Sequence, residues 1–496
     1  MAVLTKSVIR LHLLCVFFAV GSFIWGYHVG VLSSVLVHPG FIAALGKPTA
    51  AQKGLITAIY YLGTWLSYIF LSHPAADYFG RRYAGLTGAA TVAVGTAFEA
   101  GATAPGAYAM MIIGRIISGI GVAIISTSVP LYQSEVAPAA QRGKYVVLNH
   151  IGFVAGLAAG FWVGYGVTFW ETTPHSIHVS WRFSIAVVLV PCFIFAVGLP
   201  FLPETPRWLI EHGHYHRAQR SLNWLREGSY TDDEIAAELN KICDSVEEHK
   251  ALGRTWLSLF KERELFNRLW RASLLQFMSQ MCGATAMKYY LPTLLGKLGV
   301  STRITLLIGG IESTVKIGMT IIEMLIIDRV GRRATLVAGS AAMSAGMLIN
   351  GALGEAYPDN QNRAADVACI VFIFIYALGY SMGFGPAAWV YGSEIFPTSV
   401  RARGLNFSAS GGAIGSIVVA QVWPVGIDQI GSRIYFFFFA VNVVCIPIIF
   451  LFYPETKGRA LEDMDALFSK AVVGQQDELS DETEVVIPKN SKTIPL

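Results

Sequence analysis

Long apolar stretches alternate with short polar segments along most of the 496 residues of the chain. A helix needs about 20 mostly apolar residues to cross the hydrocarbon layer of a bilayer. By this criterion the pattern predicts twelve membrane-spanning helices, which a longer charged segment divides into two sets of six. The expected spans cover residues 11–36, 54–74, 84–103, 107–134, 143–168, 183–202, 269–296, 304–327, 334–354, 367–392, 405–427 and 432–453.

The charged segment after the sixth span is helix-prone and contains runs such as Asp232-Asp233-Glu234. It predicts an intracellular helical domain between two six-helix bundles, so the chain is expected to be an all-α membrane protein. The expected organisation is a cytoplasmic N-terminus at 1–10, a six-helix bundle at 11–202, an intracellular helical linker domain at 203–268, a second bundle at 269–453 and a cytoplasmic tail at 454–496.

The composition excludes a single soluble globule, because 54% of the residues are hydrophobic and only 14% are charged. Soluble domains carry about a quarter charged residues. The net charge of +4 lies mainly at the ends of apolar stretches, which indicates membrane orientation and not nucleic-acid binding. Cationic residues precede the first span, as at Lys6 and Arg10, and follow the second and fourth spans, as at Arg81 and Arg142. The positive-inside rule therefore predicts that both termini are cytoplasmic.

Candidate chemistry is sparse. The six cysteines are scattered singly, without the spacing of a disulfide framework or a metal site. The sequence shows no nucleophile–base pair, metal-ligand cluster or phosphate-binding loop. We therefore expect no enzyme activity, no metal and no cofactor.

Three charged motifs occur twice in the same order. The acidic residues of the first set recur 251, 259 and 251 positions later. Residues 77–82 return at 328–333, residues 134–143 at 393–404, and residues 203–205 at 454–456. Such a repeat predicts two parallel halves with a substrate site between them near the middle of the membrane.

The motifs resemble those of the sugar porters of the major facilitator superfamily, most of all the fungal members. The resemblance spans residues 20–465 and rests on Asp77-x-x-Gly80-Arg81-Arg82, on Gly114-Arg115 and on the repeated motifs. It implies the major facilitator fold and alternating access. It also implies a cytoplasmic charge network that holds the inner gate closed. The residues that match this network are Asp77, Arg82, Arg115, Glu135, Arg142, Glu204, Asp328, Arg332, Glu394, Arg401 and Glu455.

The family binds sugar hydroxyls with amide side chains and an aromatic residue of its pore helices. A buried hydroxyl left without a partner costs about 1–3 kcal/mol, so these groups determine affinity. The resemblance assigns the substrate site to Gln280, Thr285, Tyr289, Trp389, His150, Lys316 and Ser279. Several family amides are replaced here, for example by Ser279 and His150.

The first span carries the sharpest departure from the family pattern. Proton-coupled members have Gly-Tyr-Asp where this chain has Gly26-Tyr27-His28, so the usual carboxylate is absent. A histidine titrates near neutral pH, and His28 is the candidate proton-coupling residue. The alternative is a neutral histidine that bonds between helices, because burial disfavours the charged imidazolium.

Two lysines interrupt apolar spans. Lys316 lies twelve residues before Asp328, which places it ~18 Å along the helix and near the membrane centre. Glu312 precedes it by four residues, the favourable spacing for an intrahelical pair. Lys288 is a second unexpected cation. The lysines either form internal pairs or favour an anionic substrate.

The sequence therefore predicts a transporter of a monosaccharide or polyol, coupled to protons. It is expected to act as a monomer in the plasma membrane, with a small sugar, protons and the bilayer as its partners. One alternative is a carrier of sugar acids or quinate-like carboxylates. Another is a sensor that binds sugar without transporting it.

Overall fold

The computed structural model describes residues 6–457, apart from 104, 139–141, 171–172, 252, 254–255, 359–360 and 398–399. Side chains at 142–144, 146, 174, 249, 328 and 393 lie outside the described part as well. The regular elements within these limits are all helices. The fold is thus all-α, as expected. The expected tail at 454–496 lies almost entirely outside the described residues.

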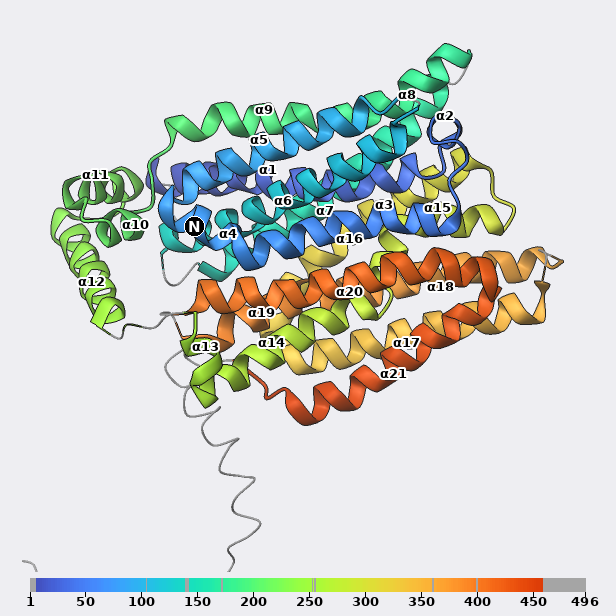
Figure 1. Cartoon of the computed structure of the whole chain (residues 1–496). Helices are drawn as coiled ribbons and strands as arrows, with labels where there is room; N and C mark the ends of the chain where they lie inside the picture. The colour runs from blue at the N-terminus through green and yellow to red at the C-terminus, as the bar shows by residue number, and fades with distance from the viewer. Residues whose placement is uncertain are drawn as a thin grey trace, which may run out of the picture.

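The first half of the chain forms one group of long helices, drawn from blue to green in the upper part of Figure 1. Its elements are α1 (Lys6–Val35), α2 (Pro39–Ala44), α3 (Ala50–Phe70), α4 (Ser72–Tyr78), α5 (Arg81–Ala100), α6 (Ala107–Val136), α7 (Arg142–Val167), η2 (Thr168–Trp170), α8 (Pro174–Ala186), α9 (Leu189–Gly198) and η3 (Leu199–Phe201).

The second half forms the other group, drawn mainly from yellow to red. It contains α14 (Arg263–Met281), α15 (Ala284–Lys297), α16 (Thr302–Val330), α17 (Arg332–Ala356), α18 (Arg363–Ser381), α19 (Phe384–Ile395), α20 (Arg401–Gln429), η5 (Gly431–Arg433) and α21 (Ile434–Phe452). The two groups meet along α3 with α20 and along α7 with α16.

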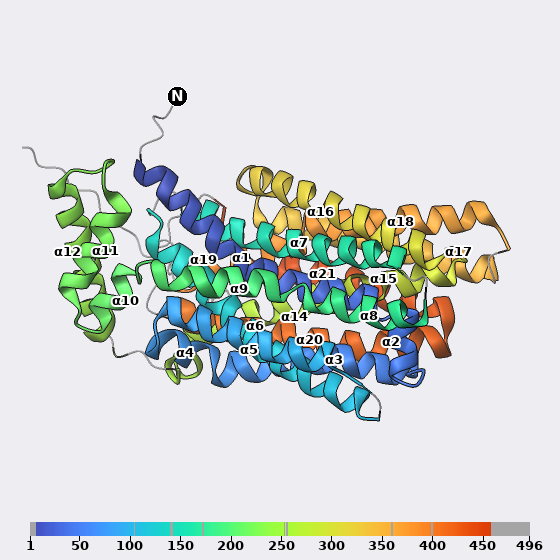
Figure 2. The same cartoon turned by 90° about the horizontal axis from the view of Figure 1, so that it is seen from above.

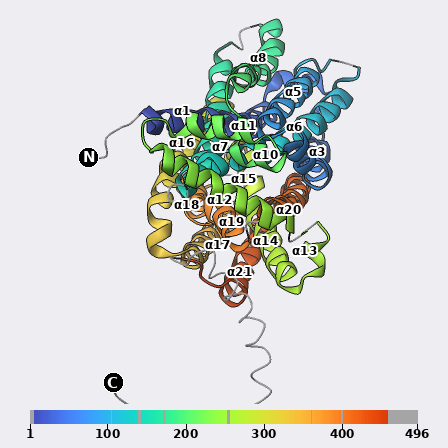
Figure 3. The ribbon, with the colours of Figure 1, turned by 90° about the vertical axis from the view of Figure 1, so that its left-hand side faces the viewer.

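Four shorter helices occupy the charged segment: α10 (Pro206–Glu211), α11 (Tyr215–Arg226), α12 (Asp232–Ala251) and α13 (Ser258–Lys261). Figures 1 and 2 both show α10, α11 and α12 beyond one end of the long helices. We call this end of the molecule the linker end. Figure 3 views the molecule from that end, with the same short helices in front of the bundle.

Eight helices of the described chain are long and apolar enough to cross a membrane, and the bent pair of α3 and α4 raises the number to nine. The expected spans at 84–103, 269–296 and 304–327 do not meet this criterion. Polarity or length is the reason: α16 contains Glu312, Lys316 and Glu323, and α15 has only 14 residues. Hydropathy alone therefore supports fewer spans than the twelve predicted.

Four expected spans are interrupted, at 54–74, 183–202, 269–296 and 367–392, and the last two breaks lie in the second half. Cys282 and Gly283 separate α14 from α15, and Gly283 has a φ of 105°, a left-handed conformation that favours glycine. Met382 and Gly383 separate α18 from α19. Both breaks frame the central cavity described below.

Glycines allow α1 and α7 to cross at very short distance. A Cβ atom on Gly26 would lie 1.8 Å from the carbonyl oxygen of Phe153, and one on Gly156 would lie 2.1 Å from that of Phe23. Side chains at these positions would push the two backbones apart. Small residues at such crossings are typical of membrane helix pairs.

Gly156→Ala is therefore expected to lower the melting temperature of the purified protein, since overpacking typically costs roughly 1–3 kcal/mol. Gly166→Ala is the matched control on the same helix, because no atom lies within 4 Å of its added methyl group. The control should be neutral or stabilising by up to about 1 kcal/mol. Thermal unfolding in detergent measures both variants, and equal melting temperatures would show that this crossing tolerates the extra atom.

Candidate functional site

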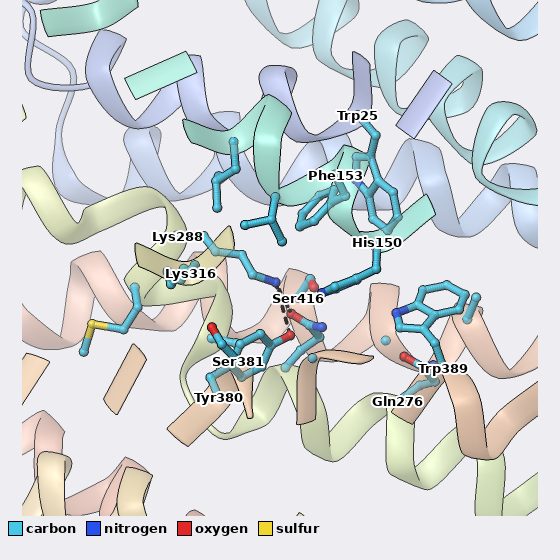
Figure 4. A pocket seen from close by; sticks show the side chains of 18 of the residues that line it. Trp25, His150, Phe153, Gln276, Lys288, Lys316, Tyr380, Ser381, Trp389 and Ser416 are labelled. Atoms are coloured by element: carbon cyan, nitrogen blue, oxygen red, sulfur yellow. Dashed lines mark hydrogen bonds between the residues drawn. The ribbon is translucent and has the colours of Figure 1, made fainter. Parts of the chain in front are cut away.

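A central cavity lies between the two halves and encloses about 1020 Å³ of empty space, including the part open to solvent. The first half contributes mainly aromatic side chains, among them Trp25 of α1 and Phe153 of α7. The second half contributes most of the polar groups, including Gln276, Lys288 and Tyr380 (Figure 4). The cavity therefore has one aromatic wall and one polar wall, an arrangement that suits a small molecule with a ring and hydroxyl groups.

The polar wall is organised around Gln280 at the end of α14. The side-chain amide oxygen of Gln280 accepts a hydrogen bond from the Thr285 hydroxyl at 3.0 Å and one from the Lys288 ammonium at 3.5 Å. The ammonium also donates to the Tyr380 hydroxyl at 3.4 Å (Figure 4). Three helices, α14, α15 and α18, thus present donors and acceptors to the same space.

The aromatic wall centres on Trp25, whose ring lies 4.6 Å from that of Phe153 between centroids. Trp389 of α19 meets Trp25 edge-on at 6.3 Å. His150 lies beside Phe153, with centroids 5.9 Å apart. These rings offer apolar surface to one face of a bound molecule.

The predicted substrate residues divide into two sets. His150, Gln280, Lys316 and Trp389 line the cavity. Ser279, Thr285 and Tyr289 are buried but are not among the lining residues.

Ser279, Thr285 and Tyr289 do not reach the cavity because neighbouring residues of a helix point to different sides of it. The Ser279 hydroxyl donates to the backbone of Gln276 at 2.7 Å. Thr285 orients Gln280, and Tyr289 faces Tyr61 with ring centroids 6.0 Å apart. These three side chains therefore contact other protein groups behind the cavity surface and do not face the cavity.

The two lysines have different surroundings. Lys316 forms an ion pair with Glu312 at 2.5 Å, as the four-residue spacing suggested. Lys288 contacts only neutral groups through its ammonium, and the salt bridges of the described side chains include none to it. Lys288 is thus a half-buried cation that lines the cavity and has no carboxylate partner in the described structure.

His28 does not line the cavity but belongs to a separate buried cluster in the first half. Its Nδ1 lies 3.2 Å from the Arg115 guanidinium, and its Nε2 lies 3.1 Å from the Thr96 hydroxyl. Arg115 was predicted to join the cytoplasmic charge network, yet it precedes Glu135 by twenty residues on α6. This corresponds to about 30 Å along the helix, so Arg115 lies far from the linker end.

The repeated motifs form two matching charge clusters, one in each half. Arg81 pairs with Glu135 at 2.9 Å, and Thr205 donates to the same carboxylate at 2.6 Å. Glu204 accepts a hydrogen bond from the backbone N–H of Arg82, at the start of α5. Burial raises the pKa of Glu204, and the backbone N–H groups of Thr205 and Arg82 oppose that shift.

The second cluster repeats this geometry. Arg332 pairs with Glu394 at 2.7 Å, and Thr456 donates to Glu394 at 2.7 Å. Glu455 accepts from the backbone N–H groups of Arg332 and Arg333, at the start of α17. In both halves a glutamate therefore caps a helix start, where a negative charge is stabilised.

Some predicted members of the network have other roles. The Arg82 guanidinium donates to the carbonyl oxygens of Pro200 and Leu202, so Arg81 is the structural equivalent of Arg332. Asp77 lies 3.7 Å from Arg81, and Arg401 donates to the Phe396 carbonyl at 3.3 Å. The side chains of Arg142 and Asp328 lie outside the described part.

Residues 14–468 match the family described as "Sugar (and other) transporter". The chain belongs to this family. It is accordingly a multi-pass integral membrane transporter and not an enzyme, and its fold resembles that of a major facilitator protein.

The similar curated proteins include fungal transporters. "MFS-type transporter criB" of Aspergillus cristatus is 28% identical over 451 residues, which cover 90% of this chain and 91% of that protein. "Probable quinate permease" of Aspergillus clavatus is 31% identical over 436 residues, covering 85% and 80%. Among solved structures, the proton:xylose symporter XylE bound to 6-bromo-6-deoxy-D-glucose has a TM-score of 0.77 at 23% identity, covering 92% of this chain and 99% of that one.

Sequence reasoning omitted several lining residues of this transporter. Gln276 precedes Gln280 by four residues, so helical periodicity could have placed both on one face. Tyr380 could not be found in this way, because its position depends on the break between α18 and α19. Trp25 and Tyr61 are aromatic residues within apolar spans and carry no local signal of a cavity.

Loss of a charge cluster at the linker end should change transport more than binding. Arg332→Gln removes a charge-assisted pair worth roughly 1.5–3 kcal/mol, which is enough to shift a conformational equilibrium about tenfold or more. We expect the transport rate to fall while equilibrium binding of substrate is retained.

Arg433→Gln provides the control, since Arg433 pairs with Glu355 at 3.1 Å while 72% of its side chain is exposed. Exposed pairs contribute little, so this variant should transport like the unmodified protein. Transport and ligand binding are measured for both variants, Arg332→Gln and Arg433→Gln, on reconstituted protein. Unchanged transport by Arg332→Gln would contradict a gating role for the cluster.

Proposed function

We propose that this transporter carries a small polyhydroxylated carboxylate, such as quinate, by alternating access between its two halves. The observation that carries the proposal is Lys288, a half-buried cation that lines the central cavity without a carboxylate partner among the described side chains. Charged groups inside membrane proteins are costly and usually serve a substrate or ion. A substrate carboxylate would supply the missing counter-charge.

Lys288 is better suited to this role than Lys316, which was the candidate from sequence. Lys316 already has Glu312 at 2.5 Å, so an incoming anion would compete with a bound carboxylate. Lys288 instead rests on neutral acceptors at 3.4–3.5 Å, which a charged acceptor would outcompete. The ammonium also lies 5.0 Å from the Tyr380 ring, an interaction that holds a cation without neutralising it.

The remaining polar groups of the cavity suit hydroxyl recognition. The Gln276 amide nitrogen and the Thr320 hydroxyl are buried, line the cavity and have no hydrogen-bond partner in the described structure. A buried polar group without a partner costs about 1–3 kcal/mol, so ring hydroxyls would gain affinity there. The opposite aromatic wall of Trp25 and Trp389 would cover an apolar ring face.

The names of several relatives agree with an acidic substrate, because fungal proteins 28–31% identical to this chain are described as probable quinate permeases. A neutral monosaccharide is the second candidate. It is favoured by the aromatic wall and by Gln280, and the structural neighbour XylE is a proton:xylose symporter. Both candidates use the same cavity and differ in their need for Lys288.

The proposed architecture has twelve spans, with α3 and α4, α8 and α9, α14 and α15, and α18 and α19 each forming one span. The polar helices α5, α14 and α16 would be sheltered within the bundle and so tolerate their charges. Both termini and α10 to α12 would lie in the cytoplasm of a plasma-membrane protein, as the cationic loops favour. The two clusters at the linker end would hold the inner gate.

Lys288→Gln is expected to raise the half-saturation concentration for quinate about tenfold or more, because a charge-assisted bond contributes roughly 1.5–3 kcal/mol. Exchange of a neutral cyclitol such as inositol should change little, since it has no charge to pair. Lys288→Arg retains the charge and is the matched control. Counterflow of labelled substrate in proteoliposomes gives all the values.

Equal losses for quinate and the neutral cyclitol in Lys288→Gln would contradict the anion proposal. Exchange of xylose but not quinate by the unmodified protein would favour the monosaccharide instead. Binding of either compound without counterflow would identify a sensor.

A further inference from the structure

A buried charged cluster in the first half is separate from both the cavity wall and the linker-end clusters. Glu99 of α5 and Arg115 of α6 are 1% and 0% exposed, and His28 of α1 is 1% exposed. The Ser118 hydroxyl donates to one oxygen of Glu99 at 2.8 Å, and the other oxygen lies 3.8 Å from Arg115. The cluster therefore contains a carboxylate on α5 that the family resemblance does not assign.

The hydrogen bonds of His28 define its protonation state. A guanidinium only donates, so Nδ1 of His28 must accept the bond from Arg115 at 3.2 Å. The other nitrogen then carries the proton and faces the Thr96 hydroxyl at 3.1 Å. A second proton would break the bond to Arg115 and place two cations in contact. His28 is therefore a neutral acceptor in this arrangement and is poorly suited to carry a proton.

Glu99 can exist in both protonation states within this cluster. Ionised, it neutralises Arg115. When it is protonated, Arg115 retains three other partners: His28, the Ile56 carbonyl at 3.4 Å and the Tyr60 ring, whose centroid lies 4.1 Å from its guanidinium carbon. The guanidinium thus keeps hydrogen-bond partners in both states, although with protonated Glu99 its charge rests on neutral groups alone, as that of Lys288 does.

We propose that Glu99 is the proton-binding group of this transporter, in place of the carboxylate that helix α1 lacks. The proposal rests on the proposed function, since it couples proton binding to movement of the substrate. Glu99 lies eighteen residues after Arg81 on α5, about 27 Å from the linker end. A proton would therefore enter from the side of the membrane opposite the gate clusters.

Tyr289 connects this cluster to the substrate wall. It follows Lys288 on α15 and faces Tyr61 of the cavity, whose ring lies 5.4 Å from that of Tyr60, the ring that Arg115 covers. Protonation of Glu99 changes the net charge beside Arg115 and hence the field at Tyr289, which belongs to the opposite half. The proton site and the substrate site thus meet at one residue of α15.

The surroundings of Glu99 contain few other titratable groups. Arg115 and Ser118 face it from α6, His28 lies behind Arg115 from α1, and Tyr60 approaches from α3. On α8, Arg182 donates to the Ala102 carbonyl near the end of α5. Arg115 is the only described cation paired with Glu99, and because a guanidinium stays protonated, the carboxyl group is the member of the pair that can exchange a proton.

Glu323 of α16 provides a comparison within the same protein. It is 1% exposed and has no side-chain partner in the described structure. Without a cation to neutralise it, ionisation would leave a bare charge in the membrane interior. Glu323 therefore should stay protonated and is the matched control for Glu99.

The test uses the full-length protein in proteoliposomes, with two measurements of labelled quinate. One is accumulation driven by an inward pH gradient, and the other is exchange against unlabelled quinate without a gradient. Glu99→Gln should reduce accumulation to the gradient-free level while exchange survives. Glu323→Gln should still accumulate quinate. His28→Asn should retain gradient-driven accumulation at a lower rate, because an amide oxygen can accept from Arg115.

A substrate-free measurement supports the same assignment. Infrared difference spectra between acidic and alkaline solution should contain a carboxyl band that is present in the unmodified protein and in Glu323→Gln but missing from the spectrum of Glu99→Gln. If Glu99→Gln fails to fold, Glu99→Asp keeps a carboxyl group and should retain accumulation with an altered pH dependence. An unshifted pH dependence in Glu99→Asp would overturn the proposal.

Other outcomes separate the two proposals. Exchange by the unmodified protein without gradient-driven accumulation would overturn the role of Glu99 and leave quinate transport intact. No exchange of quinate would overturn the proposed substrate, while the infrared spectra would still decide whether Glu99 titrates. Loss of accumulation in His28→Asn or Glu323→Gln, with Glu99→Gln unaffected, would assign the proton to another residue.

Discussion

Burying a charge in a membrane interior is the constraint on which this structure depends, because each such charge needs a partner to offset its loss of water. Lys316 has Glu312, and Arg115 has Glu99, His28 and a tyrosine ring. Lys288 has only neutral contacts. This difference separates charges that are satisfied within the protein from a charge available to a ligand.

Helix breaks provide the polar surface that continuous helices would hide. The interruptions after Met281 and Ser381 lie directly beside Gln280 and Tyr380, whose side chains both meet Lys288. Breaks in membrane helices are tolerated where the freed backbone lines a cavity or is buried in protein. The same positions that weaken the helices therefore build the site.

The repeated motifs occur in both halves of the chain, but each copy makes its contacts near the end of its own bundle. In each half a glutamate caps a helix start, and a second glutamate joins an arginine to a threonine from the following segment. The described ion pairs of Arg81 and Arg332 stay within their own half or reach α10. Each cluster thus fixes the helix ends of its own bundle.

The sequence by itself determined the all-α membrane fold, the twofold repeat and the family, because hydrophobic length and the spacing of charged motifs are properties of the chain. It also gave the Glu312–Lys316 pair, which one helix defines through its period. Only the tertiary structure brought Glu99 to Arg115 and paired Arg81 with Glu135. These contacts join different helices, and helix packing and rotation, which no local pattern encodes, decide which side chains meet.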